Sequence, residues 1–297
     1  MSRYATLGMG TVQWGMAYGI ANCTGQPSGD EVGNMLRLAK QRGVMLLDTA
    51  CTYGEAETRL GKMDAASQGF QIVTKIPPIR SEAISEKDIA TVLAAFQESL
   101  HRLQCKQVYG LMVHHADNLL LPEAERLWSA MQDLKERGLA GRIGVSVYNP
   151  AQLEKVLDRF AIDLVQLPFN IYDQRFAQTG MLRRLRDNGV EVHSRSAFLQ
   201  GLLLLTPELL PAYFNPIRSL HADWQRRASK DGLSPRDACL RFCLGHADID
   251  KVIVGCETTQ QLNEITDFAE KVEEGLSWGE SCAIYDESII NPSRWPG

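Results

Sequence analysis

Eight short apolar segments recur along the whole chain, and longer amphipathic stretches separate them. The segments are residues 6–12, 44–50, 70–76, 108–115, 142–148, 162–169, 190–196 and 250–256. Short runs rich in Val, Ile and Leu that are apolar on both faces are typical of parallel strands covered by helices. The alternation therefore predicts eight strand–helix units and an α/β fold class.

The stretches between these segments carry the marks of helices. Ser28 and Glu31 have the spacing of a capping box, and Gly43 stands where the same helix would end. Residues 85–101 place apolar side chains at 89, 92, 93, 96 and 100, which is the spacing of a buried helical stripe. Three prolines suit the first position of a helix: Pro150, Pro207 and Pro235.

Nothing in the sequence divides the chain into domains. The 297 residues contain no linker rich in Pro, Gly or Ser, no low-complexity block and no shift in composition. Eight uninterrupted units favour a closed (β/α)8 TIM barrel, and we predict a single such domain over residues 1–297. An open doubly wound sheet is the alternative, but no G-x-G-x-x-G pattern follows the first apolar segment.

Charge and cysteine content narrow the class of partner. The formal net charge is −5 without a dense stripe of Lys and Arg, so nucleic acid is not an expected partner. The seven cysteines fit neither a disulfide framework nor paired zinc ligands. The first residues lack an apolar signal segment, and no apolar run approaches the ~18 residues of a membrane helix. We therefore expect a cytoplasmic protein that binds a small molecule and makes no membrane contact.

Ionisable side chains close three consecutive apolar segments. Asp48, Lys75 and His114 stand at these ends, and Tyr53 follows Asp48 in the next loop. Because the active site of a TIM barrel lies at the carboxyl ends of its strands, we expect the four side chains to share one pocket. Taken singly, Asp48 could cap a helix, Tyr53 could be a packed phenol and His114 a hydrogen-bonded core histidine. Lys75 needs a buried partner, which Asp48 supplies.

The four residue types together suit protonation of an alkoxide as it forms. A tyrosine with a pKa of ~10 is a weak acid at neutral pH, and a nearby ammonium lowers that pKa. We expect Lys75 to lower the pKa of Tyr53 and Asp48 to hold Lys75 charged and in place. His114 would donate a hydrogen bond that orients a substrate carbonyl.

These residues lie in motifs that resemble the aldo-keto reductase family from residue 7 to about 270. The motifs are LLDTACTYGEAETRLG, VTK, LMVHHAD, RIGVSVYNP, VQLPFN and VIVGCETTQQL. The resemblance implies a (β/α)8 barrel and an NAD(P)H-dependent oxidoreductase that reduces an aldehyde or ketone to an alcohol. It also implies that Asp48, Tyr53, Lys75 and His114 form the catalytic tetrad, with hydride from nicotinamide and a proton from Tyr53.

The resemblance further implies an NADPH cofactor, with NADH also allowed, lying extended across the barrel mouth without a Rossmann domain. The positions that match the family's cofactor contacts are Gly10, Thr11, Asp48, Ser146, Gln166, Arg195, Ser196, Phe198, Gln200, Gly201, Gly255, Thr258, Gln261 and Glu264. The aromatic residues that could line the mouth are Trp14 and Tyr148, and also Tyr18, Phe169, Tyr172 and Trp295. LGMGTVQWGMAYGIAN and HSRSAFLQGLLLL resemble a bacterial branch linked to surface polysaccharides or nucleotide sugars, which implies a sugar-derived carbonyl substrate.

The sequence departs from the family pattern in three places. Val147 replaces an Asn, so one hydrogen bond to the nicotinamide carboxamide is absent. Arg195 replaces the aromatic residue that stacks on the nicotinamide, and its charge could favour an anionic substrate or the reduced cofactor. At the adenosine end, no basic residue stands ready to bind a 2′-phosphate, which weakens the electrostatic preference for NADPH. The residues there are Glu257, Gln261, Glu264 and Ile265.

Two other functions remain open at this point. One is a regulatory module that binds the cofactor as a redox sensor with slow turnover. The other is a metal-dependent barrel hydrolase with His114, His115, Asp117 and His193 as ligands. Adjacent histidines on a strand face opposite sides, so the hydrolase would need a bulge, and we predict no metal. Cys51 could be a redox-sensitive thiol, but we expect it to act as a small buried hydrophobe.

Overall fold

Eight parallel strands close into a barrel in chain order in the computed structural model, and β8 pairs with β1. The structure describes residues 6–22 and 25–296. The strands are β1 (Leu7–Gly10), β2 (Leu46–Asp48), β3 (Gln71–Ile76), β4 (Val108–Val113), β5 (Ala140–Ser146), β6 (Leu164–Pro168), β7 (Glu191–Arg195) and β8 (Lys251–Gly255). Each overlaps one predicted apolar segment, so the TIM barrel is confirmed and the open sheet is excluded.

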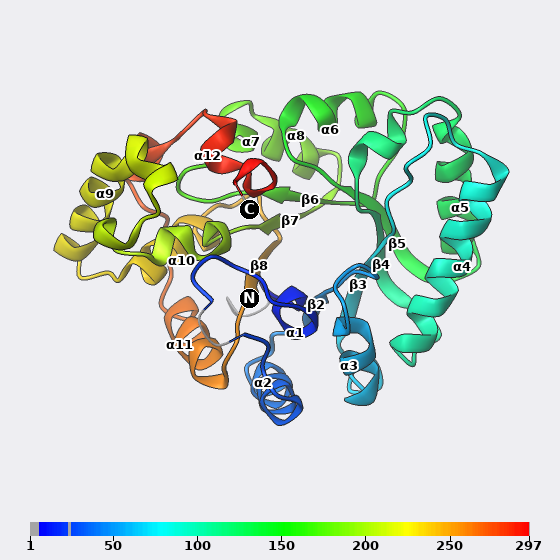
Figure 1. Cartoon of the computed structure of the whole chain (residues 1–297), viewed down its shortest axis with the longest axis horizontal. Helices are drawn as coiled ribbons and strands as arrows, with labels where there is room; N and C mark the ends of the chain where they lie inside the picture. The colour runs from blue at the N-terminus through cyan, green and yellow to red at the C-terminus, as the bar shows by residue number, and fades with distance from the viewer. Residues whose placement is uncertain (1–5, 23–24, 297) are drawn as a thin grey trace.

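Helices surround the ring of strands (Figure 1). The α-helices are α1 (Val12–Gly15), α2 (Gly29–Gln41), α3 (Ala56–Lys62), α4 (Glu86–Arg102), α5 (Ala124–Glu136), α6 (Pro150–Leu157), α7 (Arg175–Gln178), α8 (Met181–Asp187), α9 (Arg218–Lys230), α10 (Pro235–Leu244), α11 (Thr259–Ala269) and α12 (Glu287–Ile290). The 3-10 helices are η2 (Ala116–Leu119), η3 (Leu199–Leu204), η4 (Pro207–Leu209), η5 (Ala212–Ile217), η6 (Gly279–Cys282) and η7 (Pro292–Arg294). The predicted domain limits, residues 1 and 297, lie outside the described residues.

The predicted capping box at the start of α2 is only half formed. The Ser28 side chain accepts a hydrogen bond from the Glu31 N–H, as expected. The Glu31 carboxylate does not reach back to Ser28, because it accepts a hydrogen bond from the Thr259 N–H at the start of α11. The complete capping box begins α4, where Ser85 and Asp88 satisfy each other's backbone N–H groups.

The other residues that were predicted to start or end helices mostly do so. Gly43 follows α2 with a φ of 73°, a left-handed conformation that glycine adopts without strain. Pro150 and Pro235 occupy the first turns of α6 and α10. Pro207 begins only the three-residue η4, so the longer helix α9 starts later than its proline suggests.

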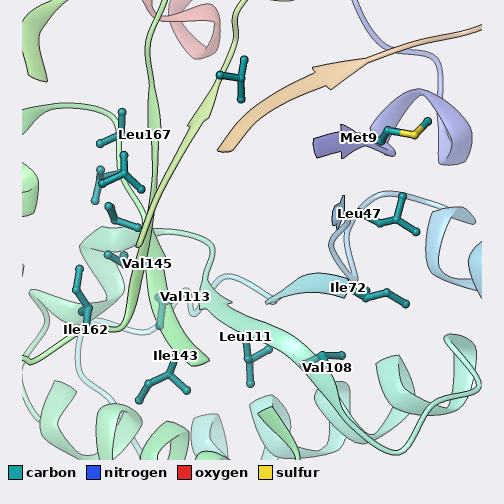
Figure 2. Packing of buried hydrophobic residues seen from close by; sticks show 14 of the residues in the cluster. Met9, Leu47, Ile72, Val108, Leu111, Val113, Ile143, Val145, Ile162 and Leu167 are labelled. Carbon is teal, nitrogen blue, oxygen red and sulfur yellow. The ribbon is translucent and has the colours of Figure 1, made fainter. Parts of the chain in front are cut away.

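Apolar side chains cover both faces of the strands, one set between the barrel and its helices and the other inside the barrel. Figure 2 shows the outer layer, where side chains such as Met9, Leu47 and Leu111 pack between the barrel and its helices. A separate inner cluster consists of Leu46, Val73, Met112, Leu164 and Ile253 from five strands. Since side chains alternate along a strand, Leu47 points outward while Leu46 and Asp48 point into the barrel. The same alternation brings polar side chains at the ends of several strands to the barrel mouth.

Two further features are the lengths of the helices and the state of the cysteines. Among the described residues, no helix combines the length and apolar character required for a membrane crossing. The six cysteines within the described ranges are free thiols, whereas Cys23 lies outside those ranges.

Candidate active site

A buried ion pair forms the floor of the site. Lys75, near the end of β3, is 1% exposed, and its Nζ donates to Asp48 Oδ1 at 2.7 Å and Oδ2 at 2.9 Å. A third bond of 2.8 Å goes to the Thr49 carbonyl oxygen, so all three ammonium donors have acceptors. Burial lowers the pKa of Lys75, but the charge of Asp48 and the interactions with Tyr53 together outweigh burial and leave that pKa raised. Lys75 is therefore a fixed positive charge at neutral pH.

Close backbone packing fixes the position of the loop that carries Tyr53. This loop joins β2 to α3 and passes against α1. A Cβ atom on Gly15 would lie 1.7 Å from the Tyr53 carbonyl oxygen, and one on Gly54 would lie 2.2 Å from the Gly15 carbonyl oxygen. Gly54 also has a φ of 53°. Only glycine fits both positions, so these two residues hold Tyr53 against the mouth of the barrel.

Tyr53 lies beside the buried ammonium. Lys75 Nζ is 5.0 Å from the centre of the Tyr53 ring. Burial raises the pKa of Tyr53, and the positive charge of Lys75 lowers it as the second-largest influence. The lowering influence predicted for Lys75 is therefore present, but the net pKa of Tyr53 is raised, because loss of hydration exceeds the stabilisation of the phenolate. Tyr53 therefore stays protonated at neutral pH, as a proton donor must.

His114 completes the group as a neutral imidazole. It follows β4, and its ring meets that of Tyr53 edge to face with 5.8 Å between centroids. Burial first, and then the positive charge of Lys75, lower the pKa of His114 to about 3. A neutral imidazole has one N–H that can donate to a carbonyl oxygen. The four side chains Asp48, Lys75, Tyr53 and His114 thus lie together at one site, as predicted.

A cavity of about 490 Å³ opens above these residues at the carboxyl ends of the strands. Asp48, Tyr53 and His114 line it, while Lys75 lies beneath. Most of the residues predicted to contact the cofactor also line it: Gly10, Thr11, Asp48, Ser146, Gln166, Arg195, Ser196, Phe198, Gln200, Gly201, Gly255 and Gln261. Thr258 and Glu264 do not line it. Thr258 accepts from the Gln261 N–H at the start of α11, and Glu264 contacts Arg236.

Arg236 is a cavity residue that the sequence did not indicate. It lies in the first turn of α10, and its guanidinium contacts Glu264 and, at 2.9 Å, Asp237. It lines the same cavity as Glu257 and Gln261. Barrel closure brings α10 beside α11, whereas no motif links Arg236 to that end in the sequence. The cavity wall near Glu257 and Gln261, where adenosine was expected to bind, therefore has a basic side chain that the sequence analysis did not predict.

The loops after β1 and β7 meet across the cavity wall. The Ile20 N–H donates to the Gln200 carbonyl oxygen at 3.0 Å. Gln200 and Gly201 have φ values of 54° and 92°, and a Cβ atom on Gly201 would lie 2.5 Å from the Ala21 Cβ. These left-handed residues turn the β7 loop back toward residues 18–22, which also contribute to the lining. Gln200 and Gly201 could be predicted from the sequence, whereas their contact with residues 18–22 could not.

The cavity suits an extended dinucleotide. Its lining includes Tyr53 and His114, which follow β2 and β4, and also Arg236 and Gln261 from α10 and α11. Gln13 also lines it, and the buried Gln13 Oε1 has no hydrogen-bond partner among the described residues. Orphaned buried acceptors are rare in proteins, and a bound ligand with donor groups would satisfy this one.

Only part of the predicted substrate contact is present. Tyr148 and Tyr18 line the cavity, as expected. Trp14 does not, because it is 0% exposed and its Nε1 donates to the Cys256 carbonyl oxygen at 3.1 Å. The expectation that Trp14 touches substrate is therefore corrected: Trp14 anchors α1 to the end of β8.

Three more aromatic residues anchor their own loops and do not line the cavity. Phe169 is 1% exposed within the core, and the Tyr172 hydroxyl bonds to His221 Nδ1 at 2.7 Å. Trp295 donates its Nε1 to the Ile289 carbonyl oxygen at 3.0 Å. An aromatic residue that lies close to a motif in the sequence can therefore either line the cavity or anchor its own loop, and the sequence does not distinguish the two.

The ligand set of the hydrolase alternative does not come together. His193 bonds to Glu191 at 2.8 Å within β7, toward the amino end of that strand, whereas His114 follows the carboxyl end of β4. His115 is exposed, although its ring is 5.2 Å from that of His114. No group of three His, Cys, Asp or Glu side chains suited to a metal ion is found in residues 6–22 and 25–296.

Cys51 lacks the properties of a redox-sensitive thiol. Burial, followed by the negative charge of Glu57, raises the pKa of Cys51 to about 11. The thiolate is the reactive form of cysteine, and it is scarce at neutral pH when the pKa lies this high. The expected role as a small hydrophobe fits this environment.

Comparison with known proteins identifies the family. Residues 6–274 match the family model described as "Aldo/keto reductase family", so the chain belongs to this family. It is 30% identical over 168 residues to the chloroplastic pyridoxal reductase of Arabidopsis thaliana, a match that covers 51% of this chain and 44% of that protein. It is 25% identical over 272 residues to the L-glyceraldehyde 3-phosphate reductase of Escherichia coli O157:H7, covering 77% and 76%.

The fold is also that of a solved member of this family. The holo form of an aldo-keto reductase from Bacillus halodurans matches 95% of this chain and 94% of its own, with a TM-score of 0.73. The two sequences are 19% identical, so this likeness concerns the fold alone.

Proposed function

We propose that this chain is an NAD(P)H-dependent oxidoreductase that reduces an aldehyde or ketone to the alcohol. Membership of the aldo-keto reductase family supports carbonyl reduction with a nicotinamide cofactor. One observation carries the assignment of roles: a charged Lys75, held by Asp48, lies 5.0 Å from the ring centre of a protonated Tyr53 at the cavity floor. A small sugar-derived carbonyl compound is the proposed substrate, in line with the L-glyceraldehyde 3-phosphate reductase among the relatives.

Each residue has a distinct part in this reaction. A reduced nicotinamide held in the cavity would supply the hydride that the carbonyl carbon accepts. The carbonyl π electrons move to oxygen, and Tyr53 transfers its phenolic proton to that oxygen to give the alcohol. Lys75 stabilises the resulting phenolate, and His114 donates a hydrogen bond that orients the carbonyl. Ser146 and Gln166 are the side chains proposed to hold the nicotinamide carboxamide.

The test is consumption of reduced cofactor. We expect purified protein to oxidise NADPH in the presence of a simple aromatic aldehyde, with loss of absorbance at ~340 nm and one alcohol formed per cofactor. A redox sensor would bind the cofactor without this turnover. Binding without turnover on a panel of aldehydes and ketones would therefore reject the proposed function in favour of the regulatory module.

NADPH is the proposed cofactor, and Arg236 is the proposed contact for its 2′-phosphate. A guanidinium binds phosphate through paired, charge-assisted hydrogen bonds. Arg236→Gln is therefore expected to raise the Kd of NADPH about tenfold and to leave that of NADH nearly unchanged. The Kd values would be measured from the quenching of protein fluorescence.

A matched control lies on the same helix. Arg241 donates to the Glu274 carbonyl oxygen and does not line the cavity, so Arg241→Gln should leave both Kd values unchanged. If the parent chain binds NADH more tightly than NADPH, the choice of cofactor is wrong. Glu257 would then be the residue to replace next, because a carboxylate repels the 2′-phosphate.

The cytoplasm is the proposed location. The six free cysteines within the described ranges support it, since unpaired thiols are typical of reducing compartments. Alkylation of intact cells with a thiol reagent that does not cross membranes would test it. Labelling of the protein before lysis would contradict a cytoplasmic location.

A further inference from the structure

Arg195 presents a cation to the catalytic end of the cavity. It ends β7, donates at 3.1 Å to the Val147 carbonyl oxygen and at 3.3 Å to the Ser196 hydroxyl oxygen. Its guanidinium carbon lies 4.6 Å from the centre of the Tyr148 ring. All these partners are neutral. These two hydrogen bonds leave other guanidinium N–H donors of Arg195 available to a ligand.

No carboxylate balances this charge within the described part of the chain. Asp48, the acidic residue closest to the reaction centre, is already paired with Lys75 at 2.7 Å. Arg236, the other arginine in the lining, differs because Glu264 and Asp237 contact it. An unpaired cation at a cavity wall is partly desolvated, which is unfavourable, and an anionic ligand that binds there supplies the missing opposite charge.

The charge of Arg195 reaches the reacting groups. Among the influences on the pKa of His114, Arg195 acts after burial, Lys75 and His115, and it lowers that pKa. It also lowers the pKa of Tyr53, after burial and the charges of Lys75 and Asp48. Arg195, Tyr53 and His114 line the same cavity. A substrate whose carbonyl lies between Tyr53 and His114 therefore lies within the field of this guanidinium.

We propose that Arg195 selects carbonyl substrates that carry a carboxylate a few bonds from the reacting carbon. This inference rests on the proposed function and deepens it by naming the substrate class. The carboxylate replaces part of its hydration with guanidinium N–H donors and meets an uncompensated positive charge in a partly water-excluded site. A neutral carbonyl compound of the same size gains neither interaction.

A pair of matched aldehydes tests the inference. The compounds 4-carboxybenzaldehyde and 4-formylbenzamide differ in charge but hardly in shape. For the parent chain we expect kcat/KM for the carboxylate to exceed that for the amide by about 10- to 100-fold. In Arg195→Met and Arg195→Gln the ratio should fall to near one, and Arg195→Lys should retain an intermediate ratio. Because the ratio compares two substrates on one variant, a change in cofactor binding cancels.

The control variant removes an arginine from the surface. Arg137 follows α5 and pairs with Asp133 away from the cavity, so Arg137→Met should keep the ratio of the parent chain. Thermal unfolding would show that each variant is folded. A ratio near one in the parent chain, or a ratio that Arg195→Met and Arg195→Gln leave unchanged, would overturn the inference while the proposed function stands.

A binding measurement separates this inference from the proposed function. Calorimetric titration of the two aldehydes into protein loaded with NADP⁺, which cannot reduce them, gives their Kd values without turnover. We expect the same preference for the carboxylate and the same loss in Arg195→Met. If neither aldehyde is ever reduced but this Arg195-dependent preference persists, the proposed function fails and the anion selectivity remains. Equal Kd values in the parent chain would reject the selectivity.

Discussion

The Tyr53→Phe variant is expected to reduce aldehydes with a kcat about 10²- to 10⁴-fold below that of the parent chain. The phenylalanine ring fills the same space in the loop between β2 and α3 but has no proton to give to the alkoxide oxygen. The Kd of NADPH should change little, because the hydroxyl takes part in proton transfer and is not among the proposed contacts with the cofactor. Steady-state kinetics and fluorescence quenching measure the two quantities separately.

Tyr109→Phe is the matched control for this substitution. The Tyr109 hydroxyl donates to Glu191 at 2.7 Å, near the amino ends of the strands and remote from the cavity. Its removal should leave kcat within about twofold of the parent value. A folded Tyr53→Phe protein that keeps more than a tenth of the parent kcat would show that another group supplies the proton.

The pH dependence of the rate should follow from the state of Tyr53. Burial leaves the pKa of Tyr53 above its ordinary value of 10, so the proton donor is intact throughout the range from pH 6 to 9. The pKa of about 3 for His114 adds no titration in the same range. Loss of rate through Tyr53 should thus begin only above about pH 10, and Tyr53→Phe should lack this loss.

The fold and the residues at the cavity floor could be predicted from the sequence because both follow from local pattern. Apolar segments of strand length, separated by amphipathic helices, predict parallel strands, and eight of them close a barrel. The carboxyl ends of such strands meet at one mouth. Asp48, Lys75 and His114 were therefore found by their positions at three strand ends, without knowledge of any distance.

What the sequence could not supply depends on three-dimensional packing. Arg236 reaches the cavity only because barrel closure sets α10 beside α11. Trp14 was expected at the mouth but is fully buried, since the direction of an aromatic side chain in a short helix is set by its neighbours. The lowering of the Tyr53 pKa by Lys75 was expected, but the larger rise caused by burial was not, because loss of hydration depends on depth, which a sequence does not contain.

Removal of either member of the Lys75–Asp48 pair is expected to destabilise the fold strongly. Lys75→Met keeps the length of the side chain but leaves the Asp48 carboxylate buried without its counter-ion. Asp48→Asn leaves the ammonium without one. Each should lower the free energy of unfolding by about 3–5 kcal/mol, the usual effect of leaving one buried charge unpaired. Urea denaturation followed by circular dichroism measures this quantity.

The double variant distinguishes an interaction between the two charges from two separate defects. With both charges absent, no buried charge is left unpaired, so the double variant should lose less stability than the sum of the single losses, by about 1–3 kcal/mol. The exposed pair Arg137 and Asp133 supplies the comparison, because an i,i+4 surface pair should show coupling of only about 0.3–0.5 kcal/mol. Purely additive losses at Lys75 and Asp48 would mean that each residue is held by other partners. Asp48 would then not be the residue that holds Lys75 beneath Tyr53. The stability of the barrel and the position of the ammonium beside the proton donor would not depend on the same ion pair.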